Sequence, residues 1–431
     1  VVIGRGVRDR VQALLGEVVR IQGDLIVVQV YEDTTGLRPG TEVHGSGQPL
    51  AIRLGPGLLG QIFDGLLRPL SASADGDVEV HVQPGLRMAP AALFPFEPAL
   101  ALGQRVAAGA VLGTAQGATG RTQRCLVPPG ASGVVESVVA AGLHAEDATV
   151  CTLRGDDGRL QELAMSHVWP VREPRPVLRR LPTGGPLVTG QRILDGLFPV
   201  ARGGKAAIPG GFGTGKTVLL EALAKGCDAD VIIYLGCGER GNEMAGVLDE
   251  FPTLTDPRTG RALMERTVII ANTSNMPVAA REASIYCAIT VAEYFRDQGL
   301  HVALMADSTS RWAEALREVS GRFGELPGEG GYPAYLSSRL ADFYERAALV
   351  EPLCGGQGSV TVMGAISPPS GDFSEPVTSH TKRYVKAFWA LDVKRAQARF
   401  YPAIHPLQSY AEHAREFALG WATQGHGQWL A

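Results

Sequence analysis

The chain has 431 residues, of which 45% are hydrophobic and 19% charged, with a formal net charge of −4 at pH 7. This length allows two or three domains and at least one large core, and the charge balance argues against a protein that wraps nucleic acid. The longest apolar candidate for a membrane span, residues 91–113, is interrupted by prolines and charged side chains. No signal pattern opens the sequence, so we expect a soluble chain. Its six cysteines lack metal-site spacing and are expected to be reduced thiols.

The first part of the chain contains short strand patterns separated by turns. Residues 15–21 and 25–31 predict a β-hairpin with Gly23 and Asp24 at its tip. No helical periodicity appears before Ile52. We therefore expect a small β-barrel over residues 1–60, in which a first strand is not recognisable.

Residues 90–170 have a different residue pattern, in which short apolar segments are separated by glycine and proline. This pattern predicts a second, compact all-β module. Residues 170–186 are rich in proline and arginine and predict a linker.

Beyond the linker, strand and helix patterns alternate. Residues 230–235, 267–271 and 301–306 are continuous apolar runs, which are typical of buried parallel strands. Residues 277–298 predict a helix that opens with a proline and is followed by Gly299. Its apolar face is expected from Ile285, Ile289 and Ala292. The alternation predicts an α/β domain with a mostly parallel sheet over residues 180–405.

A glycine-rich segment precedes the second helix pattern of this domain and fits GxxxxGK[ST]. Glycines let backbone N–H groups converge on phosphate oxygens, the lysine reaches the terminal phosphates and the threonine hydroxyl ligates Mg²⁺. The alternative is a chance match in a chain with 54 glycines. The candidate nucleotide-binding residues are Gly210, Gly211, Phe212, Gly213, Thr214, Gly215, Lys216, Thr217 and Val218.

Two carboxylates follow neighbouring strand patterns. Asp307 closes one apolar run and Glu239 lies just beyond another, and ligands of open α/β sheets gather at the carboxyl ends of the strands. We expect Asp307 to support Mg²⁺ and Glu239 to orient an attacking water, although an aspartate there could instead cap a helix. Arg240 and Arg311 are further candidates, whereas Glu243 is interpreted as a surface ion-pair residue.

Long strings around these residues resemble the catalytic A subunit of V-type and A-type rotary ATPases. They include GGKAAIPGGFGTGKT, GCGERGNEM, ALMADSTSRWAEALRE, GYPAYLSSRLADFYERA and GAISPPSGDFSEPV. The similarity runs from about Gly16 to Tyr410. It implies a RecA-like P-loop NTPase core, preceded by an N-terminal β-barrel and a bulge domain at residues 90–170.

The resemblance also implies an activity and a setting. The chain would bind ATP or ADP with Mg²⁺ and hydrolyse or synthesise ATP, coupled to H⁺ or Na⁺ transport. It would alternate with B subunits, which supply a trans arginine, in a hexameric ring with central and peripheral stalks and a membrane sector. That ring would sit at the cytoplasmic face of the membrane, and no nucleic acid is expected as a partner. The catalytic residues implied are Lys216, Glu239, Arg240 and Arg311, with Thr217 and Asp307 on the metal.

The segment RFYPAIHPLQSY matches the part of the family that places an aromatic ring against adenine, which makes Tyr401 the candidate. A tyrosine of the core or the surface is the alternative. The sequence departs from the family at Gly211, where relatives usually have proline. It also departs after Tyr410, so that residues 406–431 are expected to be a stub of an otherwise absent helical domain.

Three other functions remain open at this point. One is a truncated ring subunit or paralogue that binds nucleotide, catalyses poorly and is not coupled to rotation. Another is an export ATPase, which the bulge insert disfavours. The last is an RNA motor, which would need a basic or aromatic strand-binding face.

Overall fold

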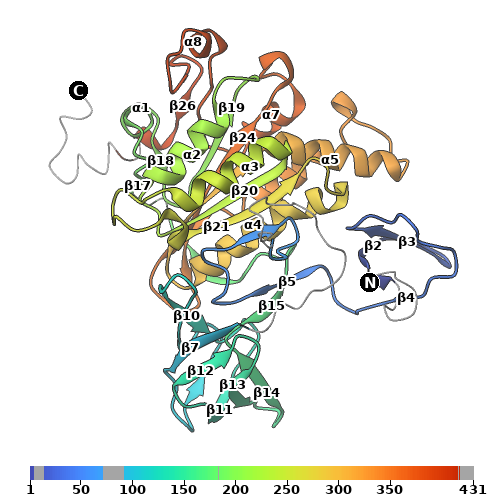
Figure 1. Cartoon of the computed structure of the whole chain (residues 1–431), viewed down its shortest axis with the longest axis vertical. Coiled ribbons are helices and arrows are strands. Elements are labelled where there is room, and N and C mark those ends of the chain that lie inside the picture. The colour runs from blue at the N-terminus through green and yellow to red at the C-terminus, as the bar shows by residue number, and fades with distance from the viewer. Residues whose placement is uncertain (4–13, 71–91, 183, 416, 418–431) are drawn as a thin grey trace.

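The computed structural model describes residues 1–3, 14–70, 92–182, 184–415 and 417. In Figure 1 an α/β region fills the upper part of the view, an all-β module lies at the lower end, and the hairpin of β2 and β3 projects to the side.

A ten-stranded sheet forms the centre of the α/β region. Its neighbouring strands β25, β19, β24, β22, β20, β21 and β6 run parallel in that order. Antiparallel pairs add β26 beside β25, β23 beside β24 and β16 beside β23. The strands are β6 (Ile62–Asp64), β16 (Val177–Arg180), β19 (Lys205–Pro209), β20 (Val231–Glu239), β21 (Thr267–Thr273), β22 (His301–Asp307), β23 (Ala348–Pro352), β24 (Gly358–Ile366), β25 (Ala387–Phe388) and β26 (Tyr410–Ala411).

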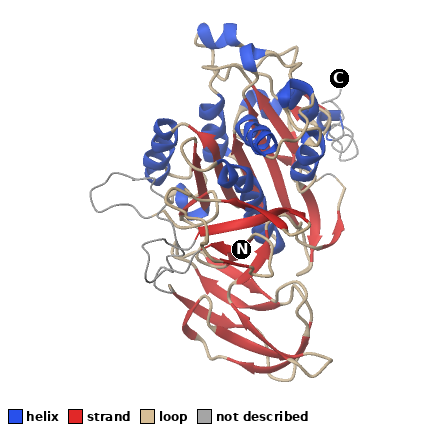
Figure 2. Cartoon of the chain, turned by 90° about the vertical axis from the view of Figure 1, so that its right-hand side faces the viewer, coloured by secondary structure: helices blue, strands red, loops and turns tan. Residues whose placement is uncertain are grey.

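Helices cover both faces of this sheet, as Figure 2 shows. Successive side chains of a strand point to opposite faces. In β20, Ile233 and Leu235 accordingly enter one hydrophobic core and Ile232 and Tyr234 the other. The helices are α1 (Arg192–Leu197), α2 (Lys216–Gly226), α3 (Gly241–Glu250), α4 (Val278–Asp297), α5 (Thr309–Arg322), α6 (Leu336–Tyr344), α7 (Pro376–Thr381) and α8 (Val393–Gln397). The expected parallel α/β fold is therefore confirmed.

The helix expected over residues 277–298 is α4, with Pro277 as its N-cap and Gly299, at φ +83°, just past its end. The sequence predicted a single apolar face, and this was wrong. Almost every residue of α4 is buried, including Glu293, which is 1% exposed. The charged positions of α4 mislead because their partners come from distant segments of the chain.

Those partners form a buried group that we call the α4 ion cluster. Arg346 Nη2 lies 2.5 Å from Glu293 Oε2, and Arg175 Nε lies 2.6 Å from Asp297 Oδ2. The cluster consists of Arg175, Glu293, Arg296, Asp297 and Arg346. Arg175 is only 4% exposed, and β16 pairs with β23. The interpretation of residues 170–186 as a linker is therefore wrong, because this segment packs into the α/β core.

The N-terminal region contains the expected hairpin, in which β2 pairs antiparallel with β3 and Gly23 turns at φ +56°. A two-residue strand, β1, pairs with both β2 and β4, where the sequence suggested no first strand. β5 pairs with β15, far along the chain, and β6 joins the main sheet beside β21. The strands are β1 (Val2–Ile3), β2 (Leu14–Gln22), β3 (Leu25–Val30), β4 (Val43–His44), β5 (Ala51–Leu54) and β15 (His167–Pro170).

The lower module consists of two four-stranded antiparallel sheets, β10–β9–β7–β12 and β14–β13–β11–β8, which enclose their own core. These strands are β7 (Leu93–Pro98), β8 (Arg105–Val106), β9 (Val111–Gln116), β10 (Thr122–Leu126), β11 (Gly133–Val138), β12 (Gly142–Ala145), β13 (Thr149–Arg154) and β14 (Leu160–Ala164). A small pair, β17 (Pro186–Leu187) and β18 (Val200–Ala201), completes the strands of the described residues.

All six cysteines are free thiols, as expected. Within the described ranges, no helix combines the length and the apolar composition that crossing a bilayer requires. Of the expected C-terminal stub, residue 416 and residues 418–431 lie outside the described residues.

Candidate active site

The glycine-rich segment connects the end of β19 to the start of α2. Its glycines are required by geometry: Gly213 and Gly215 have φ of +74° and +85°, which side chains disfavour. A methyl group on Gly210 would lie 2.4 Å from Thr214 Oγ1. Gly211 differs, since a methyl group there would meet Val393 Cγ2 at an ordinary 3.5 Å. The loop therefore has the backbone shape of a phosphate cradle at a helix N-terminus.

Lys216, the first residue of α2, turns back over this loop. Its Nζ donates hydrogen bonds to the carbonyl oxygens of Gly210 at 2.9 Å and Gly211 at 3.0 Å. Burial lowers the pKa of Lys216, while the carboxylates of Asp307 and Glu239 act in the opposite direction. Lys216 is thus half-buried beside the loop, and among the described residues its ammonium group has only carbonyl oxygens as hydrogen-bond partners.

Asp307 ends β22 and faces the same helix. Its Oδ2 accepts a hydrogen bond of 2.7 Å from Thr217 Oγ1. The side chain is buried, with the residue 2% exposed, and this burial raises its pKa. The alternative role as a helix cap does not apply, because Ser308 is the N-cap of α5.

Glu239 is the last residue of β20, which lies beside β22 in the sheet. Burial, together with the carboxylates of Asp307 and Glu243, raises the pKa of Glu239 to about 8. Glu243 lies 3.9 Å from Arg240. The expected ion pair of Glu243 is therefore present, and the Glu243 carboxylate also contributes to the raised pKa of Glu239.

The two candidate arginines lie on either side of this edge. Arg240 stacks over the Phe212 ring with its guanidinium carbon 5.2 Å from the ring centre, and Phe212 is 84% exposed. Arg311, on α5, pairs with Glu314 at 2.9 Å. Its Cβ lies 3.1 Å from where a methyl group on Gly238 would be. Both guanidinium groups are partly exposed, so they are available to an anionic ligand.

Tyr401 comes from the segment after α8, remote in sequence from the loop. A methyl group on Gly215 would lie 3.3 Å from Tyr401 Cε1, so the ring packs directly beside the glycine loop. The residue is 57% exposed. A flat aromatic ring next to a phosphate cradle is suited to stacking on a nucleotide base. Val218, on the first turn of α2, is exposed.

The residues present fit Mg²⁺ with a nucleotide. The Thr217 hydroxyl and the Asp307 carboxylate supply oxygen ligands, and Mg²⁺ typically takes one or two carboxylates plus substrate phosphates. The described part of the chain contains no cluster of three or more histidine, cysteine, aspartate or glutamate side chains that could hold a metal ion by themselves.

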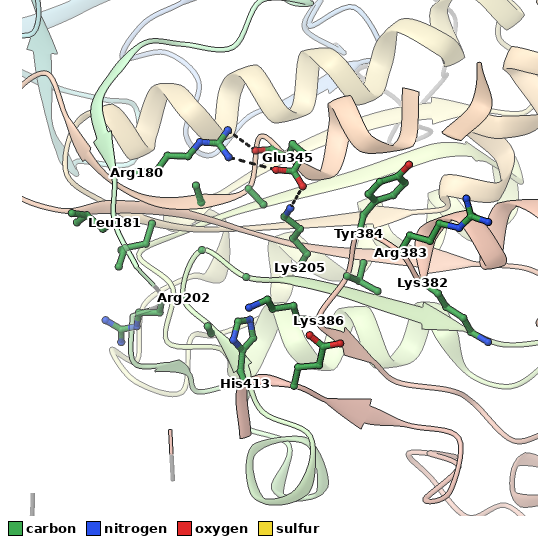
Figure 3. A pocket seen from close by; sticks show the side chains of 18 residues that line it. Arg180, Leu181, Arg202, Lys205, Glu345, Lys382, Arg383, Tyr384, Lys386 and His413 are labelled. Carbon is green, nitrogen blue, oxygen red and sulfur yellow. Dashed lines mark hydrogen bonds and ion pairs between the residues drawn. The ribbon is translucent and has the colours of Figure 1, made fainter. Parts of the chain in front are cut away.

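A separate cavity of about 420 Å³ opens beside the first residue of β19, Lys205, at the end of the strand away from the glycine loop. Figure 3 shows Arg180 and Lys205 both directed at Glu345, while Lys382 and Arg383 point away from the centre. Lys205 lies 2.5 Å from Glu345, and Arg202 is paired with Asp228 at 2.6 Å. Arg180, Lys205 and Arg202 therefore already have carboxylate partners.

Comparison with known proteins places these features in one family. Residues 190–411 match the nucleotide-binding domain of the ATP synthase alpha/beta family, residues 87–172 its barrel-sandwich domain and residues 4–47 its β-barrel domain.

Several curated relatives are similar over most of the chain. The A subunit of the A-type ATP synthase of Methanopyrus kandleri is 54% identical over 97% of this chain and 71% of its own. The corresponding A subunit of Methanoculleus marisnigri is 57% identical over 93% of this chain and 68% of its own. The V-type ATP synthase alpha chain of Halothermothrix orenii is 52% identical over 95% of this chain and 70% of its own.

Among solved structures, the assembled ATPase EscN from the type III secretion system of enteropathogenic E. coli has a TM-score of 0.64 and 24% identity. The alignment covers 96% of this chain and 75% of the EscN chain. At this level of identity the similarity supports the fold alone. The chain belongs to the ATP synthase alpha/beta family, with the A subunits of A-type ATP synthases and the alpha chains of V-type ATP synthases as its relatives.

Proposed function

We propose that the edge formed by the glycine loop, Asp307 and Glu239 is the catalytic site of an A- or V-type ATP synthase. The chain is an ATP- and ADP-binding subunit of such a multi-subunit enzyme, and it takes part in ATP synthesis or hydrolysis coupled to ion transport. One observation carries the site assignment above the others. Lys216 and Thr217 begin α2 at the glycine loop, Thr217 is hydrogen-bonded to Asp307 at the end of β22, and Glu239 ends the adjoining strand β20.

Each side chain has a task in transfer of the terminal phosphoryl group to water. Charge spreads over the equatorial oxygens of that group during transfer, and Lys216 stabilises it from the loop. Glu239 orients the attacking water and accepts its proton. Burial and neighbouring carboxylates raise the pKa of Glu239 to about 8, so it is mostly protonated at neutral pH in the nucleotide-free protein. Cations that arrive with the nucleotide would favour the carboxylate form, which accepts the proton. Arg240 and Arg311 add positive charge at the terminal phosphate, and Tyr401 stacks on adenine.

Thr217 and Asp307 hold Mg²⁺, which supplies neutralisation of phosphate charge when bound. The hydrogen bond between Thr217 and Asp307 keeps both oxygens oriented toward the cradle. Burial of Asp307 keeps this pair away from bulk water. The chain therefore provides both metal ligands from rigid elements, one from α2 and one from β22.

The setting of the site is a ring in which this chain alternates with B subunits. Arg240 and Phe212 lie on its exposed side, where a neighbouring subunit can reach the phosphates with a trans arginine. Such an arginine typically adds about 10³- to 10⁵-fold in rate, so the isolated chain turns over slowly. Stalk subunits, a membrane sector and H⁺ or Na⁺ as the transported ion complete this assignment.

The test is Glu239→Gln in the assembled complex, with Glu250→Gln, an exposed residue of the same domain, as the matched control. We expect ATP turnover to fall by about 10²- to 10⁴-fold while nucleotide affinity stays near wild type. Turnover that survives Glu239→Gln unaltered contradicts the role given to Glu239.

A further inference from the structure

The first turn of α4 is connected to the backbone of Glu239. Arg281 Nη2 donates a hydrogen bond of 2.9 Å to the Ser274 carbonyl, and the Ser274 N–H donates one of 2.8 Å to the Glu239 carbonyl. Two hydrogen bonds thus lead from Arg281 to the peptide group of Glu239. No other side chain of the described residues donates a hydrogen bond to Ser274 in this arrangement.

Arg281 also packs against the residue just before Glu239. Gly238 has φ +71°, and a methyl group there would lie 2.7 Å from Arg281 Cδ and 2.8 Å from its Nε. The Arg281 side chain therefore occupies the space that any other residue at 238 would need. Because the register between β20 and β21 shifts at Gly238, between Cys237 and Glu239, this contact limits the directions in which Glu239 can point.

The main chain of Arg281 is also hydrogen-bonded to a residue of β20. Its carbonyl oxygen accepts hydrogen bonds from Ser284 Oγ at 2.8 Å and Cys237 Sγ at 3.6 Å. The Nε of Arg281 is buried without a hydrogen-bond partner among the described residues, so the side chain is held by packing and by Nη2. Both the backbone and the side chain of Arg281 consequently contact the Cys237–Glu239 segment.

We propose that Arg281 is a positioning residue for Glu239, which it holds through Ser274 and Gly238. The inference rests on the proposed role of Glu239. It explains how a carboxylate at the free end of a strand keeps one orientation, since transfer to water depends steeply on geometry. Arg281 does not need to touch the nucleotide for this role.

The experiment compares Arg281→Ala and Arg281→Lys with Arg322→Ala in the assembled complex. Arg281 and Arg322 both line a cavity of about 880 Å³ between β3 and the end of α5. Arg322 is a suitable control because its ion-pair partner, Glu318, is exposed. We expect Arg281→Ala to lower kcat by about 10- to 100-fold, with KM for ATP and ADP affinity within about twofold of wild type. Arg281→Lys should recover part of kcat, because a lysine can still donate to Ser274. A kcat no lower than that of Arg322→Ala, or an affinity that falls in step with kcat, overturns the proposal.

A double-mutant cycle with Gly238→Ala gives a second measurement. The added methyl group should displace Arg281, so Gly238→Ala should lower kcat less in the Arg281→Ala background than in wild type. If the double variant instead loses kcat by the product of the two single-variant factors, the two residues act independently, and the proposal is contradicted. Failure of this proposal is distinguishable from failure of the catalytic assignment: loss of turnover in Glu239→Gln with full turnover in Arg281→Ala removes the positioning role alone.

Discussion

Two groups of charged side chains lie toward opposite ends of α4, and they differ in how their charges are paired. One is the α4 ion cluster; the other is the proposed catalytic edge, which consists of the glycine loop, Lys216, Glu239 and Asp307. In the α4 ion cluster every charged group has an oppositely charged partner, such as Arg346 for Glu293. At the catalytic edge, Lys216 is hydrogen-bonded only to carbonyl oxygens, and Glu239 lies near other carboxylates. Paired charges fix a structure, whereas charges without a counter-ion are available to a ligand.

This difference gives a physical reason for the location of the site. Lys216 and Glu239 form no direct ion pair among the described residues, which weakens the nucleotide-free fold, because burial disfavours both charged forms. Phosphates and Mg²⁺ would provide the missing partners. The ion cluster and the catalytic edge should therefore respond in opposite ways to substitution.

The largest effect on stability is expected in the ion cluster. Arg346→Met leaves Glu293 without its closest cation, and breaking a buried pair typically costs about 3–5 kcal/mol. Chemical denaturation should show a lower midpoint for this variant. Arg179→Met, which breaks the exposed pair with Glu351, is the control and should cost under about 1 kcal/mol. Equal midpoints for the two variants would mean that the cluster is not a structural anchor.

Lys216→Met should show the opposite pattern. We expect turnover to fall by about 10²- to 10³-fold, as for loss of a charge-stabilising donor. Because burial lowers the pKa of Lys216, its ammonium group destabilises the nucleotide-free fold, and the melting temperature should stay the same or rise. Melting curves without nucleotide, compared with steady-state rates, measure both effects. A marked loss of stability would show that Lys216 is a structural residue.

The glycine loop offers a matched pair of substitutions. Gly215→Ala places a side chain at φ +85° and 3.3 Å from Tyr401, whereas Gly211→Ala meets only an ordinary contact. The first should weaken Mg·ATP binding by about 1–2 kcal/mol, the usual strain of this backbone region. The second should stay within about twofold of wild type. Calorimetric titration with Mg·ADP checks both, and similar affinities for the two variants would argue against a cradle shaped by backbone.

The smallest expected effect concerns pH. The pKa of Glu239 is raised to about 8, so between its unfolded value near 4.5 and about 8 the folded protein holds a proton that the unfolded chain has lost. Stability contributed by this group is therefore full at low pH and decreases as the pH rises through that window. Without nucleotide, Glu239→Gln should melt slightly above wild type at pH 8, and the difference should shrink toward pH 5. A Glu239→Gln variant that melts below wild type at pH 8, with the difference again vanishing toward low pH, would mean that the pKa is depressed.

Much of the catalytic edge could be predicted from sequence because its residues lie in local patterns. The glycine loop, Glu239 and Asp307 each follow an apolar strand pattern, and parallel strands bring such ends together. The ion cluster could not be predicted, since Arg175 stands in a proline-rich segment and meets Asp297 only in the folded chain. Likewise, nothing local marks Ile62–Asp64 as a strand of the main sheet or links Arg281 to Glu239.

The central claim is that the charges at the catalytic edge are kept for phosphates and Mg²⁺. The most direct measurement is a structure of the assembled enzyme with a non-hydrolysable ATP analogue and Mg²⁺. We predict that Lys216 Nζ leaves the Gly210 and Gly211 carbonyls for the terminal phosphates and that Thr217 Oγ1 binds the metal beside Asp307. Phosphates bound elsewhere, with the Lys216 and Thr217 hydrogen bonds unchanged, would contradict this claim.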